Sequence, residues 1–206
     1  QVVLDGKAVH GYPSTQLAQM LGLLPQSPTV PEGITVADLV ARGRYPYRKF
    51  MQNMTKEDYA AVEDALERMG ITELANRCVD ELSGGQRASL ARALVLKPSL
   101  LIADEPNSAL DVPVQAKVLE LFKKLQAEIG FACLFITHDL AVVDMLADCI
   151  MVMHKGEIVE HGDADQVMNN PQNPYTQKLL ASLPVPDPRE QREHCAQLHE
   201  LLAKGI

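Results

Sequence analysis

The sequence lacks several features that would assign it to whole classes of protein. No apolar run among its 206 residues approaches the roughly eighteen residues of a membrane-spanning helix. Its first residues, Gln1 to Gly6, have the pattern of a strand and a turn rather than of a signal peptide. Cations are the minority, since 19 Lys and Arg against 27 Asp and Glu give a net charge of −8. This balance argues against a general nucleic-acid binder, which usually carries a basic face.

Paired cysteines are also missing, because no C-x-x-C sequence occurs. The cysteines stand singly, and two of them lie inside apolar, strand-like runs. Such isolated cysteines usually act as small core residues, which favours reduced thiols and a cytosolic protein. They are Cys78, Cys133, Cys149 and Cys195.

A third missing feature is the phosphate-binding loop G-x-x-x-x-G-K-[ST], which stands between a strand and a helix. Gly6-Lys7 does not supply it, because Ala8 follows the lysine and no glycine precedes Gly6. Residues 2–10 instead alternate in polarity around Asp5-Gly6, which predicts a β-hairpin. Residues 14–26 then predict a short helix, with Ser14 as N-cap, followed by a brief strand over residues 21–24.

The most informative stretch runs from Glu81 to Asp111 and contains two signals in tandem. In the first, Leu82 to Gln86 form a glycine-containing turn that opens a helix, where backbone N–H groups can approach an anion. In the second, Leu100 to Glu105 form an apolar run that ends in two adjacent carboxylates. This run predicts a buried parallel strand, and open α/β sheets bind their ligands at the carboxyl ends of such strands.

Between these regions, residues 27–80 are rich in proline and then helical. Thr55 and Asp58 predict a capping box for a helix whose apolar face would be Tyr59, Val62, Leu66 and Met69, with Gly70 at its end. The chain's one basic cluster lies just before this helix. Two readings of the cluster stay open, a solvated surface and a contact with a membrane partner. Its members are Arg42, Arg44, Arg48 and Lys49.

After the tandem signals, residues 112–130 predict an amphipathic helix that Asp111 can cap and Gly130 ends. Residues 131–137 predict a strand buried on both faces, which delivers His138 at its end. A further helix (140–147), two strands (149–154 and 157–161) and a last amphipathic helix (about 189–203) complete the prediction.

Each motif alone has an ordinary structural explanation, but their order is specific. Ser83-Gly84-Gly85-Gln86, then Asp104-Glu105, then Asp111 and then His138 resemble the ATP-binding cassette (ABC) ATPase family. The resemblance implies an α/β fold, in which a mainly parallel sheet is flanked by helices and joined to a helical subdomain. It also implies that the family's P-loop strand and helix are not in this sequence.

The resemblance further implies a division of the chain into four parts. Residues 1–26 would hold the hairpin and the start of the Q-loop, and residues 27–80 the helical subdomain. Residues 81–183 would be the core with the signature, Walker B, D-loop and switch histidine, and residues 184–206 a helical tail.

The same resemblance implies the site and its partners. Asp104 would hold Mg²⁺ through water, Gln26 would reach both Mg²⁺ and the attacking water, and Glu105 would be the general base. His138 would contact the γ-phosphate of ATP. Four signature residues would grip the nucleotide of a second, head-to-tail ABC ATPase domain, with Asp111 at the seam, and residues 27–80 would meet membrane permease subunits on the cytoplasmic face. The signature residues are Ser83, Gly84, Gly85 and Gln86.

Two details complicate the function that the resemblance implies. Residues 5–86 look like the ATPases of iron–siderophore importers, whereas residues 94–188 look like those of peptide and nickel importers. Only Arg87 to Ser89 separate Gln86 from Leu90, two residues fewer than is common in the family, which turns one part of that helix nearly opposite to the other.

We therefore expect the ATPase subunit of an importer for a metal chelate or a peptide, with little ATP binding by this chain alone. Two alternatives remain open. One is a non-hydrolysing fragment or regulatory subunit that only binds partners. The other is a soluble ABC ATPase of DNA repair or translation, although the long coiled coils and fused cassettes of those proteins are absent from this sequence.

Overall fold

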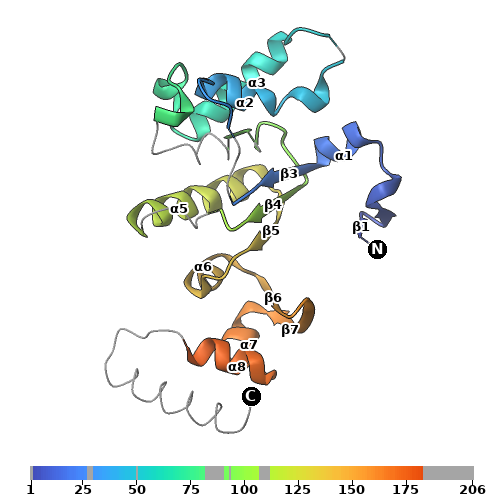
Figure 1. Cartoon of the computed structure of the whole chain (residues 1–206), viewed down its shortest axis with the longest axis vertical. Coiled ribbons are helices and arrows are strands. Elements are labelled where there is room, and N and C mark those ends of the chain that lie inside the picture. The colour runs from blue at the N-terminus through green and yellow to red at the C-terminus, as the bar shows by residue number, and fades with distance from the viewer. Residues whose placement is uncertain are drawn as a thin grey trace. The chain divides into compact units, whose positions relative to one another are not determined.

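The computed structural model describes residues 2–26, 30–49, 51–81, 91–92, 94–106 and 112–182. The chain divides into two compact units, residues 1–136 and 137–206, and each is described by itself (Figure 1). The sequence-based division into four parts stays a prediction. Among the described residues no helix is both long enough and apolar enough to cross a membrane.

The first unit is built on a parallel sheet of three strands, in the order β3-β4-β5. Leu21 pairs with Leu100, and Leu100 with Ala132, so the three strands start level with one another. Both the strand predicted at Leu100 and its parallel pairing are confirmed. The strands are β3 (Leu21–Leu24), β4 (Leu100–Asp104) and β5 (Ala132–Ile136).

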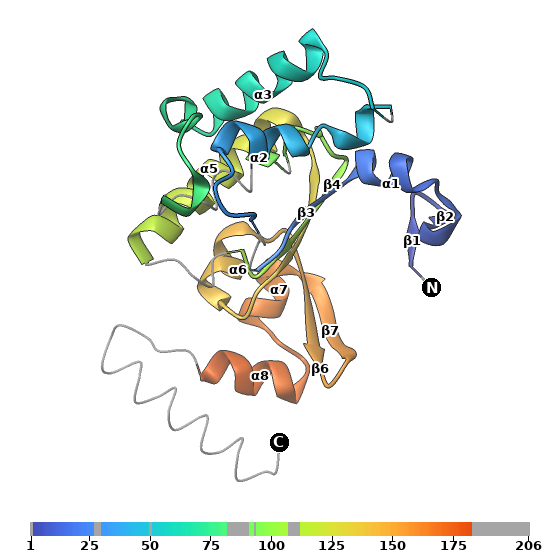
Figure 2. The same cartoon turned by 45° about the horizontal axis from the view of Figure 1, so that its top comes forward.

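One helix covers one face of this sheet. Helix α5 (Val112–Ile129) lies along the strands in both ribbon views (Figures 1 and 2). Its Phe122 makes edge-to-face contacts with Phe131 and Phe135, at centroid distances of 5.7 and 5.8 Å. Leu101 beneath it is 0% exposed. Edge-to-face packing of this kind stabilises a core beyond the area it buries.

On the other face of the sheet several of the described apolar side chains are exposed, which corrects one prediction. Strand β5 was expected to be buried on both faces, but Leu134 and Ile136 are 40% and 46% exposed. Leu23 on β3 is 57% exposed and lies in the same row, because its register partner Ile102 pairs in turn with Leu134. Alternating side chains point to opposite faces of a strand, so these residues share the uncovered face.

The N-terminal segment and the helical segment complete the first unit. The hairpin at Asp5-Gly6 is confirmed, because both residues have positive φ angles of 47° and 75°. Ser14 is the first residue of α1 rather than its N-cap, which is Pro13. The elements are β1 (Val3–Leu4), β2 (Lys7–Ala8), η1 (Val9–Gly11), α1 (Ser14–Met20), α2 (Val36–Arg42), η2 (Tyr45–Tyr47), α3 (Lys56–Arg68), η3 (Thr72–Leu74) and η4 (Val79–Glu81).

Helices α2 and α3 bury a core of their own. Val36, Leu39, Val40, Leu66 and Met69 are each at most 3% exposed. The predicted capping box is present, since Thr55 accepts from the Asp58 N–H and the Asp58 carboxylate accepts from the Thr55 N–H. The predicted apolar face is wrong at one position, because Tyr59 is 58% exposed.

The second unit is a hairpin packed on short helices. Ile150 and Val152 of the hairpin and Val167 of α7 form its buried cluster. Asn173 caps α8, accepting from the Tyr175 N–H at 2.8 Å. The elements are α6 (Leu140–Leu146), β6 (Cys149–His154), β7 (Glu157–Asp163), α7 (Ala164–Asn169) and α8 (Pro174–Ala181). The helix predicted near residues 189–203 lies outside the described residues.

Candidate functional site

The carboxyl ends of β3 and β4 bring two predicted site residues together. Gln26 stands two residues beyond β3, and Glu105 directly follows β4. Their side chains meet, with the Gln26 amide Nε2 donating to the Glu105 carboxylate Oε2 at 2.6 Å. These residues are 79 positions apart in the sequence, and only the parallel pairing of their strands makes the contact possible.

Glu105 has an unusual backbone for a residue with a side chain. Its φ angle is +42°, in the left-handed region that glycine adopts most easily. Its N–H donates to the Ile136 carbonyl at 2.9 Å, one step past the last β4–β5 pair, and a buried proline, Pro106, follows. Backbone strain of this kind persists when surrounding contacts hold it and concentrates at functional sites.

Asp104 lies beside this contact as the last residue of β4. Its register partner is Ile136 of β5, and it is exposed. Strand alternation places it in the same row as Ile102, on the uncovered face of the sheet. The carboxylate of Asp104 and the amide oxygen of Gln26 are hard oxygen donors of the kind that Mg²⁺ prefers.

The donor set is small, which fits Mg²⁺ better than most other metals. The described residues contain no group of three or more His, Cys, Asp or Glu side chains that could hold a metal ion. Mg²⁺ usually keeps several waters and binds through one or two carboxylates together with substrate phosphates. Asp104 would supply one carboxylate and Gln26 an amide oxygen, which leaves Glu105 for the attacking water.

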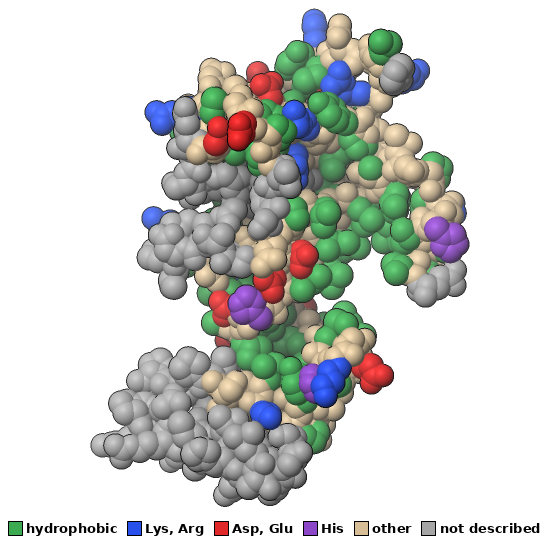
Figure 3. Space-filling view, in the orientation of Figure 1, with side chains coloured by type: hydrophobic (Ala, Val, Ile, Leu, Met, Phe, Trp, Pro, Cys, Tyr) green, Lys and Arg blue, Asp and Glu red, His purple; other side chains and the backbone are tan. Residues whose placement is uncertain are grey.

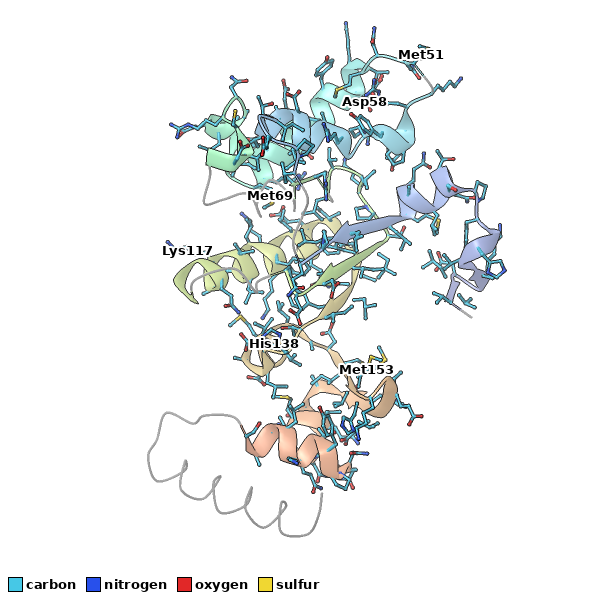
Figure 4. All side chains as sticks on the ribbon, in the orientation of Figure 1. Met51, Asp58, Met69, Lys117, His138 and Met153 are labelled. Carbon is cyan, nitrogen blue, oxygen red and sulfur yellow. The ribbon has the colours of Figure 1, made fainter. Side chains whose placement is uncertain are left out.

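The remaining predicted site residues lie in the second unit or outside the described residues. His138 is an exposed residue of the second unit, directly before the Asp139 that caps α6 (Figure 4). Its role as the switch histidine stays a prediction. The predicted signature and seam residues lie outside the described residues: Ser83, Gly84, Gly85, Gln86 and Asp111.

One member of the predicted basic cluster, Arg44, has a structural role. Arg44 is an internal anchor: its Nε contacts Asp58 Oδ1 at 2.9 Å and its Nη1 donates to the Val95 carbonyl at 3.3 Å. The Thr55 backbone N–H, and after it the Arg44 guanidinium, lower the pKa of Asp58 and outweigh the burial that would raise it. Arg44 therefore ties the helical segment to the chain near residue 95.

A cavity of about 250 Å³ opens between α3, α5 and residues 94–97. Arg68 is among its lining residues and pairs with Asp64 of its own helix at 2.9 Å and with Glu128 of α5 at 3.1 Å. Its lining includes none of the predicted catalytic residues. We therefore do not place the reaction there.

The described cysteines are free thiols, as the sequence predicts. Burial raises the pKa of Cys133 to about 11, so this thiol is protonated and unreactive near neutral pH. Cys149 is exposed rather than a core residue.

Comparison with known proteins decides the family. The sequence profile of the ABC transporter family matches residues 1–108, which is more than half of the chain. The chain belongs to the ABC transporter family. A second profile, the C-terminal region of oligopeptide/dipeptide transporters, matches residues 159–203.

Two curated relatives show how far this ABC similarity extends. The chain is 40% identical over 202 residues to the oligopeptide transport ATP-binding protein OppF of Streptococcus pyogenes serotype M1, covering 94% of this chain and 65% of that protein. It is 40% identical over 210 residues to OppF of Bacillus subtilis (strain 168), covering 97% of this chain and 68% of that protein. The chain thus spans about two thirds of the length of these relatives.

Solved structures confirm the ABC ATPase fold. One, cbiO1 from Clostridium perfringens, part of the ABC transporter complex cbiONQ, has a TM-score of 0.70 and 28% identity over 82% of this chain and 67% of that chain. Another, assigned to the metal-chelate type of ABC transporter and inward-facing, has a TM-score of 0.71 and 29% identity over 80% of this chain and 64% of that chain.

Sequence reasoning predicted Gln26 and Glu105 separately but not the hydrogen bond between them. The signal was present, because each residue closely follows an apolar strand. Neighbouring parallel strands end at the same edge of a sheet. Placing these two strands side by side would therefore have predicted the contact.

Proposed function

We propose that this chain belongs to the ATP-hydrolysing subunit that powers an oligopeptide importer. The observation that carries the proposal is the contact of Gln26 with Glu105 beside Asp104 at the carboxyl edge of the sheet. Support for the oligopeptide class comes from the names of the curated relatives and from the oligopeptide/dipeptide profile over residues 159–203.

The chemistry assigns a role to each residue of this edge. Glu105 is the general base, accepting a proton from the water that attacks the γ-phosphate. Asp104 would hold Mg²⁺ through water, and the ion would supply positive charge beside the phosphate oxygens. Gln26 positions the attacking water. To do so, its side-chain amide must break the hydrogen bond to Glu105 and form one to the water. His138 would contact the γ-phosphate.

The proposed partners follow from the same family. A second ABC ATPase domain would pair head to tail with this one, and permease subunits would contact residues 27–80 on the cytoplasmic face of the membrane. Five residues would serve the pairing: Ser83, Gly84, Gly85 and Gln86 on the partner's nucleotide, and Asp111 at the seam.

A metal chelate is the second candidate substrate. It is favoured by the likeness of residues 5–86 to siderophore importer ATPases and by the solved structure of metal-chelate type. A non-hydrolysing role, or a soluble ABC ATPase outside transport, would appear as an outcome of the following test.

The test is turnover in a chimera that carries a phosphate-binding loop, since residues 1–206 contain no G-x-x-x-x-G-K-[ST] sequence. Residues 1–206 would follow the corresponding N-terminal segment of the Bacillus subtilis relative. Glu105→Gln should keep ATP binding and lose about 10²–10⁴-fold in hydrolysis, because an amide is a poor proton acceptor. Glu120→Gln, an exposed carboxylate of α5, is the matched control. Unchanged turnover in Glu105→Gln would remove that residue from catalysis.

Substrate class is tested separately by uptake. The same chimera would replace OppF in a Bacillus subtilis strain that lacks it, and uptake of labelled tetrapeptide and of an iron–siderophore would be compared. Restored tetrapeptide uptake supports the oligopeptide assignment. Restored siderophore uptake alone favours the second candidate, and ATP hydrolysis without either uptake favours a role outside import.

A further inference from the structure

The connection between η2 and α3 presents large apolar side chains to solvent. We call residues 45–49 and 51–59 the tip. Met51 is 90% exposed and lies at the outer end of the segment (Figure 4). Tyr59, Tyr45 and Tyr47 are 58%, 56% and 43% exposed. Tyr47 is tied inward, because its hydroxyl donates to the Leu96 carbonyl at 2.8 Å and Arg44 lies over its ring. Met51, Tyr45 and Tyr59 are therefore the tip side chains available for contact.

A tight network of hydrogen bonds holds the tip in this conformation. The Gln52 N–H donates to the Lys49 carbonyl at 3.0 Å, and the Lys49 N–H donates to Gln52 Oε1 at 3.2 Å. The Arg48 guanidinium donates to the Gln52 carbonyl through both Nε and Nη2. Met51 itself has a φ angle of +59°. These hydrogen bonds hold Met51 in a strained backbone conformation, in which its side chain is exposed to solvent.

The charge of the tip is opposite to that of the chain. Arg48, Lys49 and Lys56 have no carboxylate partner among the described residues. Of the two acidic residues in the tip, Asp58 is 3% exposed and paired with Arg44, which leaves Glu57 as the exposed one. Three cations against one exposed carboxylate stand out in a chain of net charge −8. Blue and green side chains lie together at the end that carries η2 and α3 (Figure 3).

We propose that the tip binds the anionic surface of a lipid bilayer. Tyrosine favours the headgroup region, where its ring is apolar and its hydroxyl stays hydrated. Lys and Arg side chains whose charge no carboxylate neutralises are drawn to the negative potential of anionic lipids. Met51 would enter the acyl boundary between them. This contact goes beyond the proposed ATPase function, because it would bring the helical segment to the membrane independently of any permease.

The shape of the tip favours a bilayer over a partner helix. Protein helices usually dock into a hydrophobic groove, and the cavity found in this unit lies between α3 and α5, with no tip residue in its lining. At the tip Met51 projects outward and is 90% exposed. A projecting apolar residue flanked by cations is the arrangement by which interfacial proteins enter headgroups.

Vesicle co-sedimentation of the 206-residue chain tests the proposal. The probes are phosphatidylcholine vesicles with and without about 30 mol% phosphatidylserine, because anionic lipid supplies the surface potential. We expect binding to the anionic vesicles, weakened by salt, and far less to neutral ones. Each tip lysine is worth about fivefold, so Lys49→Gln with Lys56→Gln should weaken binding about 25-fold. Met51→Ser should weaken it about tenfold.

The matched control is Lys117→Gln with Lys123→Gln, two exposed lysines of α5 in the same unit. This double change alters net charge equally, so it should leave binding within about twofold of the original chain. Equal losses in the two double variants would reduce the effect to net charge and overturn the proposal. Absence of binding to anionic vesicles would do the same and would direct attention to a protein partner. Neither result bears on ATP hydrolysis, which the chimera measures separately.

Discussion

The helical segment and the parallel sheet of the first unit differ in how completely they bury their apolar side chains. In the helical segment, Leu39 and Met69 are 1% and 2% exposed within a core formed by α2 and α3 themselves. In the sheet, Leu23, Leu134 and Ile136 are 40% to 57% exposed on the face opposite α5. One region encloses its apolar side chains and the other presents half of them to solvent.

The two regions differ in where their polar groups find hydrogen-bond partners and in what covers their apolar side chains. The polar groups of the helical segment are satisfied nearby: Thr35 caps α2, the Thr55–Asp58 box caps α3, and Arg44 neutralises Asp58. The strands are apolar on both faces, which is the composition of a sheet covered on both sides. Mutations should therefore damage the helical segment more than the open face of the sheet, as the following variants test.

The largest effect is expected from Asp58→Ala. This change removes the α3 capping box and leaves the Arg44 guanidinium, 15% exposed, without its carboxylate. Breaking such a pair should lower the free energy of unfolding by about 3–5 kcal/mol, measured by urea denaturation. Asp64→Ala is the matched control, since its 42%-exposed side chain pairs with Arg68 on the surface and should cost at most about 1 kcal/mol. Equal losses would contradict the distinction.

The next effect is expected from Gly43→Ala. A Cβ at this position would meet the Arg92 carbonyl oxygen at 2.3 Å and Val95 Cγ1 at 2.4 Å. The φ angle of Gly43 is −61°, so alanine suits the backbone and the whole cost comes from overpacking. We expect a loss of about 1–3 kcal/mol in the free energy of unfolding. A stabilised variant would mean that residues 92–95 can move away from α2.

The free energy of unfolding should depend on pH through the ionisation of Asp58. Its pKa is lowered from the ordinary value of 3.8 in the folded state, so its ionised form stabilises the fold above that value. The contribution is lost as the pH falls through the folded-state pKa. The difference in unfolding free energy between the original chain and Asp58→Asn should therefore be constant above about pH 5, which is about one unit above the ordinary pKa. Below about pH 5 this difference should become smaller as the pH falls. A gap that widens in acid would contradict this sign.

The sequence predicts caps and turns of this chain better than it predicts which face of a helix or strand is buried. Thr55 and Asp58 specify a capping box because both partners lie within one turn. Asp5-Gly6 specifies its hairpin for the same reason, since the turn needs only those two residues. Tyr59 and Leu134, by contrast, have the composition of buried residues, and whether a neighbour covers them is decided by residues distant in the chain.

The candidate site shows the same division. Asp104 and Glu105 are identified by their position at the end of an apolar strand, and Gln26 by its place between the first hairpin and the signature. Their order resembles that of a known family, and this gives their roles. The left-handed backbone of Glu105 and the 2.6 Å contact with Gln26 depend on the pairing of β3, β4 and β5. No local pattern encodes that pairing.

The smallest change in stability is expected on the open face of the sheet. Leu23→Thr combined with Leu134→Thr introduces β-branched side chains suited to strands and removes apolar surface that is already in contact with water. We expect the free energy of unfolding to change by at most about 0.5 kcal/mol for each position.

The same double variant should nonetheless alter association strongly. Strand β5 is an edge strand among the described residues, and Leu134 together with Leu23 presents exposed apolar surface on the open face of the sheet. Exposed apolar surface of this kind favours self-association. Light scattering should show the 206-residue chain associating with rising concentration and the double variant remaining closer to a monomer. Leu101→Ala, at a position 0% exposed on the covered face, provides the contrast, because it should cost about 2–5 kcal/mol in stability. If the double variant instead unfolds as readily as Leu101→Ala, the two faces are equally buried in solution, and the contrast between the sheet and the helical segment is wrong.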